Sequence, residues 1–189
     1  MKNSILILLF LYPVQFFSQV IDELPTDENG NLYYSEVIQV ENADKNELYL
    51  RSKQFFAEIF KSANDVIQMD DKDSGIIIGK GFNDIYITVI GIATPIQMWY
   101  SIKIQSKDDR YKYDIYDIYF KSYPGQYGVT TTSAEKMFDK EKYYKNNGKP
   151  RNVLEKYKIE TEAKIKNLES AIKSKMENAA ISNDQDKDW

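Results

Sequence analysis

The stretch Ile96–Phe120, IQMWYSIKIQSKDDRYKYDIYDIYF, decides the fold class of this chain. In its first half, apolar residues alternate with mostly polar ones, which puts five apolar side chains, from Ile96 to Ile104, on one face of a strand. The polar tetrad Lys107–Arg110 interrupts the alternation, and a Tyr- and Ile-rich run follows it. A polar turn between two strand-like runs is typical of a β-hairpin, so the sequence predicts an antiparallel sheet around this hairpin.

The second run of the hairpin contains a change of phase. Its apolar residues form two sets in opposite phase, Tyr111, Tyr113 and Ile115 followed by Tyr116, Ile118 and Phe120. A regular strand cannot turn both sets towards one core, because successive side chains point to opposite faces. We therefore predict a β-bulge near Ile115 or Tyr116, or else a strand that is covered on both faces at its far end.

Further strands and one helix are expected on the N-terminal side of the hairpin. Gly79 and Gly81 lack the spacing of a phosphate-binding loop, and we interpret them as a strand end or a bulge. Asp44 and Glu47 have the capping-box spacing that opens a helix, whose wide apolar stripe predicts packing across the sheet. The strand patterns cover Leu32–Val40, Val66–Met69, Gly75–Lys80 and Phe82–Ile92.

Two helices are expected after the hairpin. Thr132 and Glu135 can cap a first helix that runs to about Lys145. In the second, Asn152–Asn178, apolar residues recur every three or four positions, which predicts one amphipathic helix. Its apolar stripe could pack on its own sheet or on a partner helix. We favour its own sheet, because Thr161 lies in the stripe and weakens it as a coiled-coil seam.

The segment Met1–Gln19 has the pattern of an export signal. Lys2 precedes the unbroken apolar run Ile5–Leu11, and the small residue Ser18 suits cleavage near Ser18-Gln19. We prefer a signal peptide to a membrane anchor or a first core strand, because spanning a bilayer takes about 20 apolar residues. We expect an exported mature chain, periplasmic or secreted, without a membrane span. The predicted organisation is a signal peptide at 1–19, an α+β domain at 20–124, a helical extension at 125–181 and a disordered tail at 182–189.

The composition excludes several kinds of chemistry. The 189 residues include no Cys and no His, which removes disulfides, thiolate nucleophiles, imidazole proton shuttles and the commonest metal ligand. The formal net charge of −4 gives no general attraction to nucleic acid, which we do not expect as a partner. Asp27–Asn31 and Asp70–Asp73 fail the register of a calcium loop and are interpreted as turns. We therefore expect neither a metal nor a cofactor.

Three motifs together are similar to those of a known family. They are Glu47-Leu48-Tyr49 near the start of the first helix, GIIIGKGF at 75–82 and SIKIQSKDDRYKYDI at 101–115. From Leu32 to Tyr123 the chain resembles the DUF4468-like family of exported bacterial domains of unknown function, whose fold is like that of the TATA-binding protein (TBP). The resemblance implies an α+β fold, with a helix packed on one face of a curved antiparallel sheet. It implies no reaction and no catalytic residue, and such a fold does not by itself imply DNA binding.

We expect a non-catalytic binding module whose partner is an envelope protein, a peptide or a polysaccharide. The chain has 15 Tyr, a side chain that pairs an apolar ring with a polar tip and suits recognition surfaces. β-Propensity alone would place many of these rings in and around the sheet. The candidate contact residues are Trp99, Lys103, Arg110, Tyr111, Tyr113 and Tyr116.

Two alternatives stay open. Glycan binding would use exposed aromatic rings, with Trp99 and Lys103 on the polar face of the central strand, and Trp99 buried beneath a helix would exclude it. A carboxylate hydrolase would need two acids about 5–10 Å apart. Asp114 and Asp117 lie inside a strand pattern, but their spacing puts them on opposite faces unless the predicted bulge intervenes.

Overall fold

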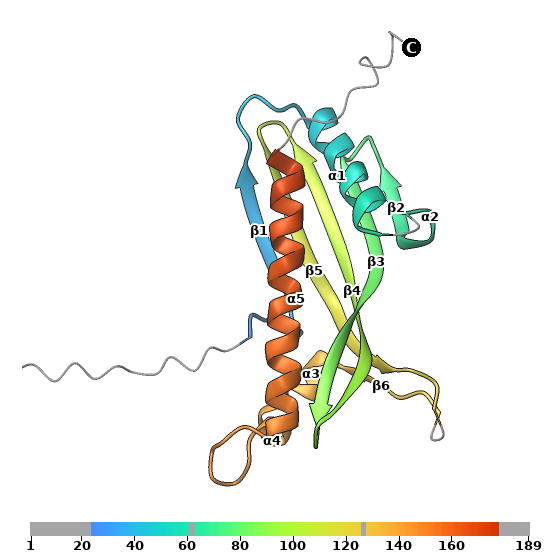
Figure 1. The fold of residues 1–189 in the computed structure, drawn as a ribbon. Helices are drawn as coiled ribbons and strands as arrows, with labels where there is room; N and C mark the ends of the chain where they lie inside the picture. The colour runs from blue at the N-terminus through green and yellow to red at the C-terminus, as the bar shows by residue number, and fades with distance from the viewer. Residues whose placement is uncertain (1–23, 61–62, 126–127, 178–189) are drawn as a thin grey trace, which may run out of the picture.

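The computed structural model describes residues 24–60, 63–125 and 128–177. In these residues six strands form one antiparallel sheet, and helices α1 and α5 lie on the same side of it (Figure 1). The predicted signal peptide and C-terminal tail lie outside the described residues. The elements are β1 Tyr34–Gln39, α1 Lys45–Ile59, α2 Ala63–Val66, β2 Ile67–Asp71, β3 Ile76–Val89, β4 Ile92–Lys107, β5 Arg110–Ser122, β6 Thr131–Ser133, α3 Ala134–Met137, α4 Lys140–Tyr143 and α5 Asn152–Glu177.

The predicted hairpin forms the centre of the sheet. The strand order is β1-β5-β4-β3-β2, and the short strand β6 pairs with the last part of β5. Lys107 pairs with Arg110 across the hairpin, which confirms the turn that the polar tetrad predicts. Asp109 in this turn has a positive φ of 59°, a conformation that Asp tolerates well. The α+β class predicted from the hairpin and its flanking helices is confirmed.

Strand β3 is one continuous strand of 14 residues where the sequence pattern predicted two. Its register with β4 has no break, so the predicted strand end at Gly79 and Gly81 is wrong. On the other side, the register with β2 shifts next to Gly79, where Ile67 pairs with Gly79 and Met69 with Ile78. The two glycines instead make room for helix α1. A Cβ on Gly79 would lie 2.3 Å from a ring carbon of Phe56, and one on Gly81 would lie 2.3 Å from a ring carbon of Phe60. The glycines therefore reflect tertiary packing rather than a local backbone feature.

The β-bulge predicted around Tyr116 is present in β5. Tyr116 and Tyr119, three residues apart, pair with Ser101 and Trp99 of β4, which are only two apart. Asp117 is the exposed residue of the bulge and has a left-handed φ of 53°. Asp adopts this conformation more readily than a β-branched residue does.

The bulge brings both apolar sets of β5 to one core. The three residues before it and the two after it are each at most 2% exposed: Tyr111, Tyr113, Ile115, Ile118 and Phe120. Without the extra residue, one of the two sets would face the opposite side of the sheet.

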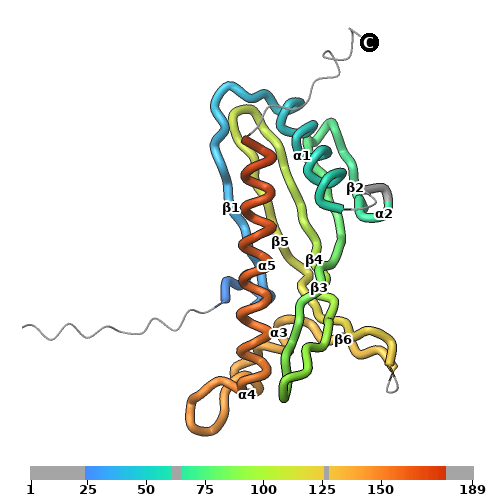
Figure 2. Tube along the Cα trace, viewed as in Figure 1, coloured from blue at the N-terminus to red at the C-terminus, as the bar shows by residue number. Residues whose placement is uncertain are grey.

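Helix α5 packs on its own sheet, as its apolar stripe predicts. Ile165, Leu168, Ile172 and Met176 belong to the same hydrophobic core as the strands. The tube in Figure 2 shows how α5 extends along most of the length of the sheet. None of the described helices combines the length and apolar content that crossing a bilayer requires.

Two polar side chains fix α5 against its neighbours. Buried Arg51 of α1 donates a hydrogen bond to the carbonyl of Met176, where a cation complements the negative end of the α5 dipole. The Tyr113 hydroxyl of β5 lies 2.9 Å from a carboxylate oxygen of Glu36 in β1 and 3.0 Å from one of Glu169 in α5. Tyr113 therefore connects three elements from inside the core.

The single helix predicted from Thr132 to about Lys145 is wrong. The chain forms two one-turn helices there, α3 and α4, each with its own N-cap. Ser133 caps α3, and Asp139 caps α4 by accepting from the backbone amides two and three residues further on. Asp139 lies in the middle of the predicted helix, and its bonds to the backbone start a new helix instead of continuing the first.

We predict that Gly79→Ala destabilises the protein because its Cβ would collide with Phe56. Overpacking of this kind lowers the free energy of unfolding by about 1–3 kcal/mol. The control is Gly125→Ala, at a loop position where the nearest atom to a Cβ is a backbone oxygen 4.0 Å away. Urea titration followed by circular dichroism measures both variants. Equal midpoints for Gly79→Ala and the control would contradict the role given to this glycine.

Candidate ligand-binding face

One side of the sheet carries no helix in the described part of the chain. The buried apolar residues of α1, α3 and α5 all join the core on the other side. A sheet that is covered on one face alternates core-facing with solvent-facing side chains, so the uncovered face holds the polar half of the pattern. We call this surface of β3, β4 and β5 the open face. Its side chains include Ile76, Ile78, Lys80, Phe82, Asp84, Tyr86, Gln97, Trp99, Ser101, Lys103, Gln105, Lys107, Arg110, Lys112, Asp114, Tyr116, Asp117, Tyr119 and Lys121.

Three aromatic side chains form a row across the open face. Phe82, Trp99 and Tyr119 are paired neighbours on β3, β4 and β5. The ring centroids of Phe82 and Trp99 are 4.8 Å apart, and those of Trp99 and Tyr119 are 6.0 Å apart with ring planes only 4° from parallel. Phe82 is 39% exposed, although an apolar ring of this size gains from burial. We call these three residues the aromatic row.

Two lysines lie on the rings of the aromatic row. The Lys80 ammonium is 5.2 Å from the ring centroid of Tyr119, and the Lys121 ammonium is 5.9 Å from that of Trp99. Both distances fall within the range of a cation–π interaction, which contributes about 0.5–1 kcal/mol at exposed sites. The indole N–H of Trp99 donates to the Gln97 side chain at 3.1 Å, which fixes the orientation of the ring. The row therefore has positive charge next to it on both sides.

The bulge of β5 determines which residues reach this row. Tyr119 and Lys121 follow Asp117, and the extra residue turns them to the open face together with Trp99. In an unbulged strand they would share the phase of Tyr111 and would point towards the helices. The same residue thus completes both the core and the aromatic row.

A shallow hollow of about 230 Å³ lies at the hairpin end of the open face. It is lined by three cations and three other residues: Lys107, Arg110, Lys112, Val37, Gln105 and Tyr111. The turn aspartates at this end are occupied by the backbone, because Asp108 accepts from the amide of Lys45 and Asp109 from that of Asn42.

Asp114 is the buried carboxylate of the open face. Its side chain accepts from the Ser35 hydroxyl at 2.7 Å and pairs with the Lys112 ammonium at 3.0 Å, which connects β5 to the edge strand β1. Burial alone would raise the pKa of Asp114. Hydrogen bonds from Tyr33, Ser35 and Lys112, with the charge of Lys112, outweigh burial and hold this pKa below its ordinary value. Asp114 therefore stays ionised at neutral pH.

Asp114 and Asp117 lie in different settings. Asp117 is exposed at the bulge, where the Ser101 hydroxyl donates to it at 3.3 Å. A general acid needs a carboxyl group whose pKa is raised towards neutrality, whereas that of Asp114 is lowered. The pair favours a structural role over acid catalysis. No cluster of three or more acidic side chains with metal-binding geometry occurs among the described residues.

The structure separates the six candidate contact residues into two groups. Trp99, Lys103 and Tyr116 lie on the open face, and Arg110 lines the hollow at its end. Trp99 is half-buried and no helix covers it. The other two candidates, Tyr111 and Tyr113, are 1% and 0% exposed, which corrects their proposed role as a contact surface, although Tyr111 also borders the hollow at the hairpin end. Both precede the bulge in the core-facing phase of β5, where burial of the ring outweighs exposure of the hydroxyl.

Sequence reasoning missed the other members of the aromatic row and its lysines. Phe82 and Lys80 fall on the solvent-facing positions of β3, and Tyr119 and Lys121 fall on the solvent-facing positions of β5 after the bulge. Their position beside Trp99 depends on the register between strands. These residues could have been found by first fixing the hairpin register and the bulge, and then selecting the side chains that point to the same face of the sheet as Trp99.

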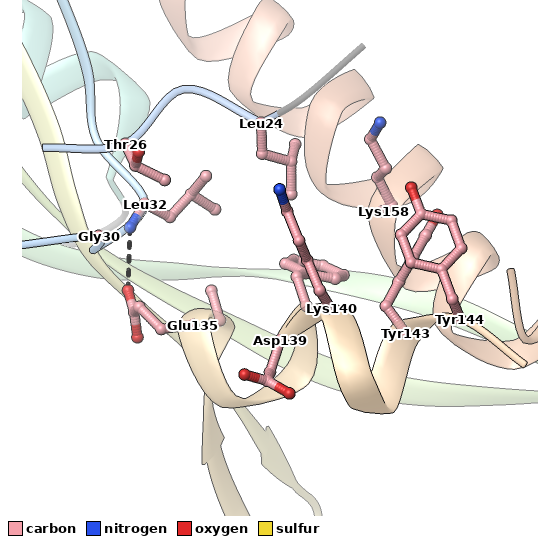
Figure 3. A pocket seen from close by; sticks show the side chains of 12 residues that line it. Leu24, Thr26, Gly30, Leu32, Glu135, Asp139, Lys140, Tyr143, Tyr144 and Lys158 are labelled. Atoms are coloured by element: carbon pink, nitrogen blue, oxygen red, sulfur yellow. Dashed lines mark hydrogen bonds between the residues drawn. The ribbon is translucent and has the colours of Figure 1, made fainter. Parts of the chain in front are cut away.

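A second concavity of about 440 Å³ lies away from the open face, between the N-terminal segment, α3, α4 and α5 (Figure 3). Its floor is apolar and includes Leu32 and Phe138. Two of its carboxylates serve local structure, because Glu135 accepts from the amide of Leu32 and Asp139 caps α4. This cavity marks the junction where the N-terminal segment meets the C-terminal helices.

The fold defines an α+β protein of the TBP-like class, with an antiparallel sheet covered by helices on one side. Residues 34–121 match the family model described as a domain of unknown function (DUF4468) with TBP-like fold. The chain therefore carries a DUF4468 domain over these residues, as the motifs in its sequence predict.

Two crystal structures resemble most of this chain. One is a DUF4468 family protein from Bacteroides ovatus ATCC 8483, with a TM-score of 0.68, 15% sequence identity, and coverage of 86% of this chain and 95% of that one. The other is a TBP-like protein from Parabacteroides distasonis ATCC 8503, with a TM-score of 0.64, 20% identity, and coverage of 82% and 98%. At these identities the likeness shows the fold. No curated protein matches the chain.

We predict that Asp114→Asn lowers stability in a pH-dependent way. The native pKa of Asp114 lies below its unfolded value of about 3.9. Its carboxylate therefore stabilises the fold above that unfolded value, and this contribution disappears as the pH falls through the lower native pKa. At pH 7 the variant should lose about 1–3 kcal/mol, the usual cost of weakening a buried charged hydrogen-bond network.

Denaturant titration between pH 7 and pH 3 measures this difference. Asp117→Asn is the control, because Asp117 is an exposed neighbour with a single 3.3 Å hydrogen bond, and a change within about 0.5 kcal/mol is expected for it. A deficit for Asp114→Asn that stayed constant across the acidic range would show that the ionised carboxylate is not the source of stability.

Proposed function

We propose that this protein is a non-catalytic, exported binding module that holds its ligand on the open face, with the aromatic row at the centre of the contact. One observation carries the proposal. Three neighbouring aromatic rings stand half-exposed on a sheet face without a helix, next to two lysines. Aromatic and cationic side chains with exposed apolar area are the usual anchors of recognition surfaces.

The chemical inventory supports binding over catalysis. The chain has no His and no Cys, so acid–base or nucleophilic catalysis would fall to carboxylates, Lys or Tyr. The buried carboxylate of the open face has a lowered pKa and bonds that serve the β1–β5 pairing. Tyr113 hydrogen-bonds inside the core, and burial together with Glu36 and Glu169 raises its pKa, which keeps the phenol protonated. These groups hold the fold together.

Export supports an envelope or extracellular ligand. The leader-like segment Met1–Gln19, with a cleavage pattern near Ser18-Gln19, is the basis for placing the mature chain in the periplasm or outside the cell. The partners available there are envelope proteins, peptides and polysaccharides. A ligand of any of these kinds can lie along a sheet face that is wide enough for several contacts.

The proposal predicts that binding depends on Trp99. The processed protein is immobilised and exposed to envelope fractions of the producing organism, and retained protein and carbohydrate are quantified separately. Trp99→Ala should reduce retention by about tenfold or more, the effect of removing a central aromatic anchor. The mass of the secreted or periplasmic protein tests in the same preparation whether the leader is removed near Ser18-Gln19.

Tyr144→Ala is the matched control, since Tyr144 is a half-buried tyrosine on the helical side of the molecule. It should retain the same material as the wild type. Equal retention by Trp99→Ala and the wild type, with both folded by circular dichroism, would place any binding surface elsewhere and refute the proposal.

A further inference from the structure

We propose that the ligand of the open face is a linear acidic polysaccharide, of the class whose sugar units carry regularly spaced carboxylates. The inference rests on the proposed function and names the ligand class for the same surface. Three observations support it: the positive charge of the open face, the bonds that its carboxylates already form within the protein, and the stacking of the aromatic row.

The open face is basic although the chain is acidic. The whole chain has a formal net charge of −4. The open face has a net positive charge, because it contains six cationic side chains and three carboxylates. The cations are Lys80, Lys103, Lys107, Arg110, Lys112 and Lys121. Charge of one sign gathered on one surface attracts ligands of the opposite sign and steers their approach.

The carboxylates of the face are largely engaged by the protein itself. Asp114 pairs with Lys112, and Asp84 accepts from the Tyr123 hydroxyl at 2.8 Å. By contrast, Lys80, Lys103 and Lys121 form no ion pair with any described residue. These three ammonium groups are therefore available to an anionic ligand.

The positive charges follow a path along the strands. The hollow lined by Lys107, Arg110 and Lys112 marks one end, and Lys121 lies at the other, opposite Gln97. Ten residues of β4 separate the two ends, which corresponds to about 34 Å of strand. A single small anion can contact only one part of this path. A linear polymer with repeated carboxylates can contact several parts at once and gains affinity through multivalency.

The stacking of the aromatic row favours an acidic sugar over a neutral one. The rings of Trp99 and Tyr119 are nearly parallel and stack on each other. The ammonium groups of Lys80 and Lys121 lie over the rings of Tyr119 and Trp99. Trp99 and Tyr119 therefore present mainly ring edges, which carry the positive end of the aromatic quadrupole. A neutral sugar or a nucleobase needs an open ring face on which to stack. Ring edges beside ammonium groups suit a sugar with a carboxylate.

The test uses the intrinsic fluorescence of Trp99. The chain has two tryptophans, and Trp189→Phe leaves Trp99 as the only one. This protein is titrated with oligogalacturonates of increasing length, with dextran as a neutral polymer and with oligo-dT as a polyanion that is not a carbohydrate. We expect the Trp99 signal to saturate only with oligogalacturonate, affinity to rise with chain length, and binding to weaken as salt screens the lysines.

The matched charge variants locate the site. The triple change Lys80→Gln, Lys103→Gln and Lys121→Gln should weaken binding by about 10–100-fold, since each exposed ion pair contributes up to about fivefold. The control triple, Lys136→Gln, Lys145→Gln and Lys166→Gln, removes the same charge from exposed lysines on α3, α5 and the loop after α4. It should stay within about twofold of the wild type. Thermal unfolding verifies that both triples are folded.

The possible failures are distinguishable. Saturation by dextran, or by oligo-dT as tightly as by oligogalacturonate, would overturn the ligand class. Equal affinity of the two lysine triples for oligogalacturonate would overturn the site. If none of the three polymers binds while Trp99→Ala still loses retention of envelope material, the proposed function stands and the acidic-polysaccharide inference falls. If Trp99→Ala also retains normally, both fall.

Discussion

One extra residue in β5 constrains the whole structure. The strand contains two buried apolar sets in opposite phase, and a regular β-strand can bury only one of them in a given core. The bulge at Asp117 resolves this conflict by shifting the phase between Ile115 and Ile118. Its left-handed backbone costs little for Asp compared with the burial of Ile118 and Phe120, each of which contributes roughly 1.5–3 kcal/mol. The bulge is therefore favoured by the core itself.

The same shift builds the outer surface. Every side chain of β5 after Asp117 exchanges faces relative to an unbulged strand, so Tyr119 and Lys121 join Trp99 on the open face. The opposite face of the sheet is shaped to accommodate helix α1. Gly79 and Gly81 have no side chains where Phe56 of α1 and Phe60, the C-cap residue of this helix, pack on the sheet. Core formation and the candidate binding surface thus depend on one backbone irregularity, and the helices leave the second face of the sheet to the solvent.

Much of the fold could be predicted from local patterns because these patterns report burial directly. The alternation from Ile96 to Ile104 predicts a strand covered on one face, the phase conflict in β5 predicts the bulge, and the period of α5 predicts its packing. The continuity of β3 could not be predicted, because Gly79 and Gly81 respond to a helix distant in sequence. The break between α3 and α4 was also missed, since a side chain–backbone bond of Asp139 competes with helix continuation.

The candidate site was only partly predictable for a related reason. Trp99, Lys103 and Tyr116 follow from alternation within a single strand or from the phase before the bulge. Tyr111 and Tyr113 were assigned to the surface because tyrosine suits both interiors and surfaces, and composition alone cannot separate the two uses. Which residues belong to the aromatic row depends on how β3, β4 and β5 pair with one another, and the pattern of a single strand does not contain this information.

The most direct test of this account is the free energy of unfolding of a protein that lacks Asp117, compared with Asp117→Gly. Glycine keeps the bulge and adopts its positive φ readily, so the glycine variant should unfold within about 1 kcal/mol of the wild type. Deletion forces Ile118 and Phe120 towards the solvent, so the free energy of unfolding should fall by about 3–6 kcal/mol or the protein should fail to fold. A deletion protein that unfolds at the same denaturant concentration as the wild type would contradict the claim that this one residue sets both faces of the sheet.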